Sequence, residues 1–206
     1  MKKAIIMVLI CLLSVLMLSS CQQTENNQQG NDSDTQSDVI SDNEDFNNAD
    51  NTADTSVFGA FSAKDLDGNE VTQEIFASNK LTMVNIWATF CGPCINEMPD
   101  LGELAAEYAD KGVGIVGIPL DVTDEKGNID SYLYNEAVDI VATTKAAYTH
   151  IVPVESMFVR KLASVTAVPE TIFVDSQGNQ VGDCYYGARS KAQWTEIIEE
   201  LLGEVQ

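Results

Sequence analysis

Basic side chains and histidine are scarce in this 206-residue chain. It has 11 Lys and Arg against 32 Asp and Glu, a formal net charge of −21, and its single histidine is His150. Recognition of nucleic-acid phosphates needs a basic face, so this composition argues against a nucleic-acid partner. Zinc needs four ligands, and neither His150 nor Cys184 has the usual spacing from the Cys91/Cys94 pair. The sequence therefore predicts no metal site.

The first twenty residues combine a basic start with an apolar run. Lys2 and Lys3 precede a stretch without charge, a pattern typical of a secretory signal peptide over residues 1–20. The run ends in "LSSC", which resembles the lipobox of bacterial lipoproteins, in which the cysteine is lipidated and the preceding peptide is removed. Cys21 is therefore the predicted lipidation site; the alternative is an uncleaved signal anchor with an incidental cysteine. Either case puts the rest of the chain outside the cytoplasm.

Residues 21–56 have an unusual composition. They contain no Lys or Arg and hardly any large apolar side chain. Such a segment cannot bury enough surface to offset its chain entropy. We expect a lipidated, acidic, disordered tether over residues 21–56, followed by one folded domain over residues 57–206.

Strand-like and helix-like patterns alternate in this domain. Continuous apolar runs at 81–87 and 113–121 predict strands buried on both faces, and apolar residues spaced by three and four after Cys94 predict a helix. Strands that alternate with helices indicate an α/β sandwich around one central sheet. The other expected elements are a hairpin at 61–72, a helix over 128–148, a hairpin over 170–188 and a last helix that starts at a Ser190–Gln193 capping box.

The two cysteines of "CGPC" could form a zinc half-site, a structural staple or a redox couple. A disulfide between residues three apart closes a very small loop, so its stabilising effect is low. At a strand-to-helix junction, the helix N-terminus stabilises a thiolate on the first cysteine. Redox chemistry is therefore favoured, with Cys91 as the exposed nucleophile and Cys94, one turn into the helix, as the resolving thiol.

The stretch "VNIWATFCGPCINEMP" resembles the active-site region of thioredoxin-like proteins of the TlpA/ResA/DsbE disulfide reductase family. The resemblance runs from about Phe58 to Leu202. It implies a thioredoxin-like three-layer α/β/α sandwich with an N-terminal β-hairpin and a central insert. It also implies catalysis without a bound cofactor, through the redox-active Cys91–Cys94 disulfide.

The same resemblance implies the residues of a substrate groove. Its cis-proline segment matches "AVPETIFVD", which makes Pro169 the expected cis residue. In this fold the residue before that proline exposes its backbone for β-like pairing with a substrate chain. The expected groove residues are Trp87, Gly92, Pro93, Val168, Pro169 and Glu170.

One departure from thioredoxin concerns the proton acceptor. Asn85 replaces the buried aspartate of thioredoxin, so another group must accept the proton of Cys94. We expect Glu97 to do so, since a partly buried carboxylate has a raised pKa; a solvated helix glutamate is the alternative. Cys184 is expected to be a buried small hydrophobe, with a second redox role as the alternative, and His150 an exposed or half-buried residue.

The resemblance implies an extracytoplasmic thiol:disulfide oxidoreductase, lipid-anchored to the outer face of the bacterial cytoplasmic membrane. It would reduce exported proteins such as apocytochrome c or an exported methionine sulfoxide reductase. A membrane electron donor of the CcdA/DsbD type would then re-reduce it. The alternatives are a disulfide-forming oxidant with the same residues, and a non-catalytic surface lipoprotein that uses the thioredoxin fold for binding.

Overall fold

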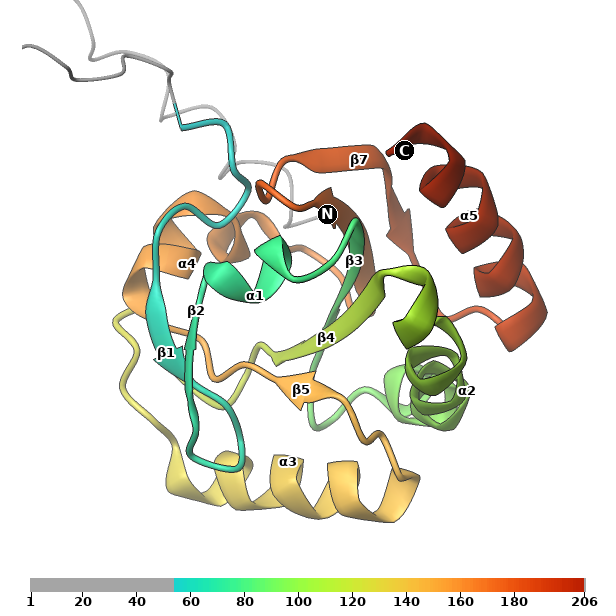
Figure 1. Cartoon of the computed structure of the whole chain (residues 1–206). Coiled ribbons are helices and arrows are strands. Elements are labelled where there is room, and N and C mark those ends of the chain that lie inside the picture. The colour runs from blue at the N-terminus through green and yellow to red at the C-terminus, as the bar shows by residue number, and fades with distance from the viewer. Residues whose placement is uncertain (1–53, 206) are drawn as a thin grey trace, which may run out of the picture. The chain divides into compact units, whose positions relative to one another are not determined.

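A five-stranded sheet forms the centre of the fold, with the strand order β5-β4-β3-β6-β7 (Figure 1). The computed structural model describes residues 54–205. The predicted signal peptide, Cys21 and most of the predicted tether therefore lie outside the described residues. Central strand β3, Leu81–Trp87, has the predicted bounds, and all of its residues are buried. It pairs in parallel with β4, Val113–Pro119, and antiparallel with β6, Glu170–Asp175.

The other elements follow the predicted alternation along the chain. The expected helix at 128–148 is shorter than predicted, because Asp130 caps its start and Lys145 ends it with a φ of 56°. The remaining bounds are β1 Ser62–Lys64, β2 Glu70–Thr72, α1 Glu74–Ala77, α2 Gly92–Tyr108, η1 Ala109–Lys111, α3 Ser131–Thr144, β5 Thr149–His150, α4 Glu155–Arg160, η2 Leu162–Ser164, β7 Gln180–Tyr186 and α5 Lys191–Glu204.

Two layers cover the sheet, which confirms the predicted three-layer sandwich. The β1–β2 hairpin, α1 and α4 pack on the face that contains Val84 and Ile86 of β3. Helices α2 and α5 pack on the opposite face, around Leu81, Met83 and Trp194, and α3 adjoins α2 there. Burying one large aliphatic side chain, such as that of Leu81 or Met83, stabilises the fold by about 1.5–3 kcal/mol. Both predicted hairpins and the Ser190–Gln193 capping box are present.

Three turns share the sequence pattern Asp-x-x-Gly-Asn and the same hydrogen bonds. In each, one oxygen of the aspartate accepts from two backbone N–H groups and the other accepts from the asparagine amide. Each glycine has a φ between 77° and 85°, a conformation that favours glycine. Local chemistry therefore fixes these turns, which begin at Asp65, Asp124 and Asp175.

The start of the described chain is attached to the domain. The carbonyl oxygens of Asp54 and Ser56 accept hydrogen bonds from Arg160, and Val57 N–H donates to the carbonyl oxygen of Gly178. Contacts with the domain thus begin slightly before the predicted boundary at residue 57. Among residues 54–205, none of the helices combines the length and apolarity that a membrane crossing requires.

Candidate active site

Cys91 and Cys94 lie at the junction where strand β3 leads into helix α2. They form a disulfide with a Cα–Cα distance of 5.3 Å. Cys91 is the N-cap residue of α2, and the backbone N–H of Cys94 donates to Cys91 Sγ over 3.3 Å. The first N–H groups of a helix have no partner within the helix, so they favour negative charge on a group placed there. The junction can therefore stabilise a Cys91 thiolate after reduction.

The predicted exposure of Cys91 is wrong for this oxidised state. Cys91 is 6% exposed and Cys94 is fully buried. Both pack into an apolar cluster with Trp87, Met98 and Val152, and this packing leaves little of the disulfide in contact with solvent. The small exposed area nevertheless belongs to Cys91, so the predicted order of accessibility holds.

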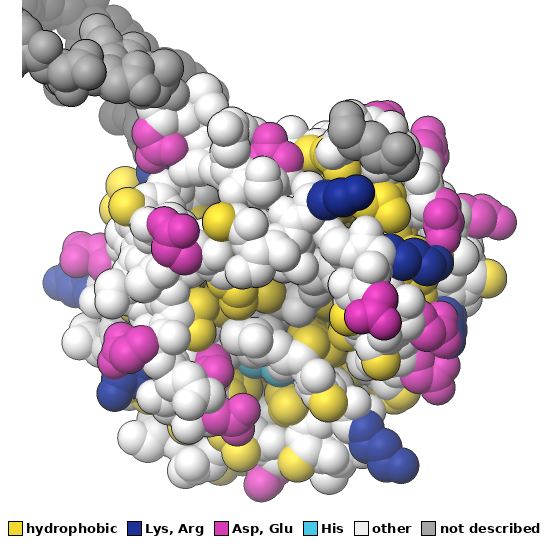
Figure 2. Space-filling view, viewed as in Figure 1, with side chains coloured by type: hydrophobic (Ala, Val, Ile, Leu, Met, Phe, Trp, Pro, Cys, Tyr) yellow, Lys and Arg dark blue, Asp and Glu magenta, His cyan; other side chains and the backbone are white. Residues whose placement is uncertain are grey.

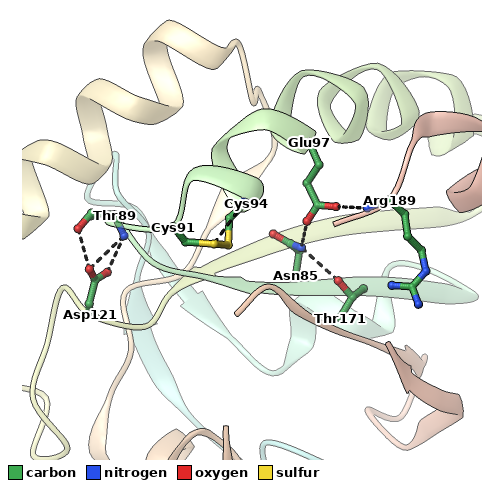
Figure 3. Close-up of a disulfide and its surroundings, with 8 residues drawn as sticks. All are labelled: Asn85, Thr89, Cys91, Cys94, Glu97, Asp121, Thr171 and Arg189. Carbon is green, nitrogen blue, oxygen red and sulfur yellow. Dashed lines mark hydrogen bonds between the residues drawn. A yellow bond between two sulfur atoms is a disulfide. The ribbon is translucent and has the colours of Figure 1, made fainter. Parts of the chain in front are cut away.

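Glu97 lies one turn beyond Cys94 and is 3% exposed. Its Oε1 accepts a hydrogen bond from Asn85 Nδ2 over 3.0 Å, and its Oε2 accepts one from the Arg189 backbone N–H over 3.0 Å (Figure 3). Oε2 also accepts from Trp194 Nε1 over 3.2 Å. Burial raises the pKa of Glu97, and these three donors and the charge of Arg189 oppose the rise. The expected direction of the shift is confirmed, and the solvated-helix alternative does not fit the burial.

Asn85 connects Glu97 to strand β6. Its Nδ2 donates both to Glu97 and, over 3.1 Å, to Thr171 Oγ1. Its Oδ1 is buried and has no partner among the described residues. Asn85 is therefore well placed to orient the carboxylate.

The expected groove residues separate into two groups. Gly92 and Pro93 are exposed, and half-buried Val168 lines a cavity of about 200 Å³ together with exposed Phe90. The Val168–Pro169 peptide bond is cis, as predicted, but Pro169 itself is buried and does not line the cavity. Among the residues that the structure describes, the backbone N–H and C=O of Val168 have no hydrogen-bond partner. A free backbone edge thus lies beside the cavity.

The other two groove predictions are wrong in this structure. Trp87 is fully buried on strand β3, where its ring packs edge-on against His150. Glu170 is 1% exposed, and its Oε1 is 2.5 Å from Lys161 Nζ. Trp87 packs beside Met98 of α2, and Glu170 lies on the opposite face of the sheet beside Lys161, so neither side chain contributes surface to a groove.

His150 is also more buried than predicted, at 3% exposure. It pairs with Gly117 in the sheet, and the missing side chain of that glycine leaves room for the imidazole. Burial lowers the pKa of His150 to about 4, against a hydrogen bond with the Ala146 carbonyl oxygen. Cys184 is a half-buried free thiol packed against the core, close to the expected small hydrophobe.

Asp121 belongs to the site, although the sequence patterns did not indicate it. Both of its carboxylate oxygens accept from the Thr89 backbone N–H, over 3.1 and 3.0 Å, and Oδ2 also accepts from Thr89 Oγ1 over 2.6 Å (Figure 3). An acidic residue just after a buried strand could have indicated it, because adjacent parallel strands end at the same edge of a sheet. Arg189, Thr171 and Trp194 were also missed as partners of the Glu97–Asn85 pair.

The surface of the domain carries many acidic side chains (Figure 2), as the excess of Asp and Glu over Lys and Arg in the sequence implies. Acidic side chains are spread over the face shown in Figure 2 rather than gathered in one patch. Among residues 54–205, no group of three or more His, Cys, Asp and Glu side chains is arranged to hold a metal ion. The chemistry-bearing groups that the structure does bring together are the disulfide and the two carboxylates on either side of it.

This fold, with a Cys-x-x-Cys disulfide at the start of α2 and a cis-proline, defines a thioredoxin-like protein. The chain belongs to the Redoxin family, whose model matches residues 49–183. It is 39% identical over 143 residues to the thiol-disulfide oxidoreductase ResA of Bacillus thuringiensis subsp. konkukian. The aligned region covers 68% of this chain and 74% of that protein. The chain is therefore a thiol-disulfide oxidoreductase of the ResA type.

Solved structures agree with this assignment. A thiol:disulfide interchange protein of the thioredoxin family from Chlorobium tepidum TLS superposes with a TM-score of 0.59 at 23% identity, over 73% of this chain and 99% of that one. MTB dsbF, in its mixed oxidized and reduced forms, superposes with a TM-score of 0.53 at 26% identity, over 68% of this chain and 94% of that one. The first likeness supports the fold alone.

Proposed function

We propose that this protein is a disulfide reductase that acts outside the cytoplasm on exported proteins. The observation that carries the proposal is the disulfide at the N-terminus of α2 with the buried Glu97 one turn further on. The dipeptide between the cysteines is that of thioredoxin, whose reduction potential is about −270 mV, far below the −120 mV of DsbA. The secretory signal and the lipobox-like Cys21 support export and lipid anchoring.

The proposed reaction transfers two electrons from the dithiol to the substrate. The Cys91 thiolate attacks a substrate disulfide, forms a mixed disulfide and releases one substrate thiolate. Glu97 then accepts the proton of the Cys94 thiol, either directly or through water. The Cys94 thiolate attacks Cys91 Sγ, forms the Cys91–Cys94 disulfide and releases the second substrate thiolate. The reaction needs no bound cofactor.

Substrate recognition uses the backbone beside the disulfide. The unpaired N–H and C=O of Val168 can pair with an extended substrate segment, as in strand addition. The cavity between Phe90 and Val168 can hold an apolar side chain of that segment. Apocytochrome c and an exported methionine sulfoxide reductase are the proposed substrates, and a membrane dithiol carrier of the CcdA/DsbD type is the proposed electron donor.

Trapping of the mixed disulfide tests this proposal. With Cys184→Ser as background, the reduced Cys94→Ser variant should accumulate a covalent complex with oxidised apocytochrome c that dithiothreitol dissolves. The matched Cys91→Ser variant should trap nothing. Reduced Cys91–Cys94 protein should also convert the oxidised substrate to its dithiol form. If the oxidised protein instead forms the disulfide in reduced substrate, the direction is that of an oxidant. If Cys94→Ser traps neither apocytochrome c nor an exported methionine sulfoxide reductase, and the reduced protein reduces neither of them, the result favours a binding module.

A further inference from the structure

Among the described residues, one side chain outside the redox helix forms hydrogen bonds with the turn that leads into this helix. Residues 88–91 form a turn in which the Cys91 N–H donates to the Ala88 carbonyl oxygen over 3.0 Å. Within this turn Thr89 is 5% exposed, while Phe90 is 79% exposed. The Thr89 backbone N–H and hydroxyl both donate to Asp121, which lies just after strand β4.

Strand register explains why these residues meet. Strands β3 and β4 run parallel with Trp87 opposite Pro119, and the Leu120 N–H donates to the Trp87 carbonyl oxygen over 2.8 Å. Thr89 and Asp121 each lie two residues beyond that pair, past the ends of the two strands, and so they are side by side. Hydrogen bonds to a charged group are stronger than those between neutral groups, so the Thr89 N–H, shared between both carboxylate oxygens, and the Thr89 hydroxyl can together fix the turn.

We propose that Asp121 is a positioning residue for the redox reaction: its bonds to Thr89 hold Cys91 Sγ over the N-terminus of helix α2. The sulfur can be stabilised as a thiolate only while it stays near the free N–H groups of that helix, such as that of Cys94 at 3.3 Å. Those N–H groups lie within the first turn, and their effect falls off beyond it. Asp121 therefore acts on Cys91 through the turn, and its charge is not what makes the cysteine reactive.

Two substitutions at Asp121 separate position from charge. Asp121→Asn keeps an oxygen that accepts from the Thr89 N–H but removes the negative charge, whereas Asp121→Ala removes both. Loss of a nearby negative charge lowers a thiol pKa, and loss of the helix N–H groups raises it. The other titratable side chains around the disulfide, Glu97, Tyr148 and His150, are the same in both variants.

The pH dependence of Cys91 alkylation tests the proposal. The full-length protein is reduced, treated with iodoacetamide across a pH series, and followed at Cys91 by peptide mass spectrometry. The pH at which Cys91 alkylation is half-maximal should be the same in Asp121→Asn as in wild type, or lower. In Asp121→Ala this midpoint should lie about half a pH unit or more above that of Asp121→Asn. Coinciding midpoints would overturn the proposal, because charge alone would then account for any change.

Two further variants keep the test decisive. Thr89→Ala removes only the hydroxyl bond to Asp121, so if Asp121→Ala does not fold, Thr89→Ala should give a smaller upward shift, and no shift would count against the proposal. Asp175→Ala breaks similar carboxylate bonds in a hairpin turn at the opposite end of β6 and should leave the midpoint unchanged. The inference rests on the same redox pair as the proposed function. Alkylation of Cys91 depends neither on a substrate nor on the direction of electron transfer. The inference on Asp121 and the proposed function can therefore fail separately.

Discussion

Two carboxylates flank the disulfide, and they lie in different environments. Asp121 is half-buried, and among residues 54–205 its carboxylate forms hydrogen bonds only with Thr89, in the turn before Cys91. Glu97 is almost fully buried and accepts from three donors that come from β3, α5 and the segment between β7 and α5. Burial raises the pKa of Glu97. The comparison indicates that the same chemical group serves to fix geometry on one side of the pair and to exchange a proton on the other.

Removing the proton acceptor Glu97 should affect the reaction more than any of the other changes described below. Glu97→Gln keeps the size of the side chain but cannot accept a proton, so release of substrate from the mixed disulfide should slow by about 10²-fold. Its rate should also lose the pH inflection that Glu97 causes above the ordinary pKa of a glutamate. Rapid-quench measurements of the mixed-disulfide lifetime check this.

Glu103→Gln is the matched control for that experiment. Glu103 lies on the same helix but is exposed, and it pairs with Lys191 on the surface. This variant should keep both the wild-type rate and the pH inflection. If Glu103→Gln and Glu97→Gln behave alike, Glu97 has no special role in the reaction.

His150 is a second buried group that titrates in the acid range, so its removal sharpens the assignment to Glu97. Its pKa is about 4 in the fold against an ordinary 6.5, so the unfolded chain binds more protons between these values. The stability from neutral His150 is complete above pH 6.5 and is lost as the pH falls toward 4, by about 3 kcal/mol. Urea unfolding from pH 7 to pH 4 should show this loss in wild type and not in His150→Gln. If the free energy of unfolding falls equally with pH in the two proteins, His150 is not the cause of the loss.

A smaller effect is expected from the donors that surround Glu97. Trp194→Phe removes one hydrogen bond to Oε2, which should raise the Glu97 pKa further and move the pH inflection of the reaction upward. The lost bond should also lower the free energy of unfolding by about 1 kcal/mol. Ile198→Val removes a buried methylene from the same helix. It should lower stability comparably without moving the inflection, and a shift in this control would show that packing alone sets the inflection.

Locally encoded elements could be predicted from the sequence. Strand β3 has its predicted bounds because its apolar run is continuous, and helix α5 begins where its capping box lies. The Cys91–Cys94 pair was predicted from its contiguous motif, and the cis-Pro169 bond from the resemblance of its segment to thioredoxin-like proteins. Short-range sequence patterns therefore predict most of the fold and the two reacting cysteines.

The supporting contacts of the site could not be predicted in the same way. Asp121 meets Thr89 across 32 residues, and Glu97 meets Trp194 across 97, so no local pattern marks either contact. Burial of His150 depends on the absent side chain of Gly117 in a neighbouring strand. Burial of Glu170 similarly depends on Lys161 from another element, which pairs with it. Each of these depends on tertiary packing that the sequence pattern does not encode.

The reduction potential of the Cys91–Cys94 pair tests the proposed function most directly. Equilibration with glutathione or dithiothreitol buffers, followed by quantification of the dithiol in a Cys184→Ser background, gives the value. We expect a potential near or below about −250 mV, as for a reductant that needs a membrane electron donor. A value near −120 mV would contradict it and make the protein a disulfide-forming oxidant.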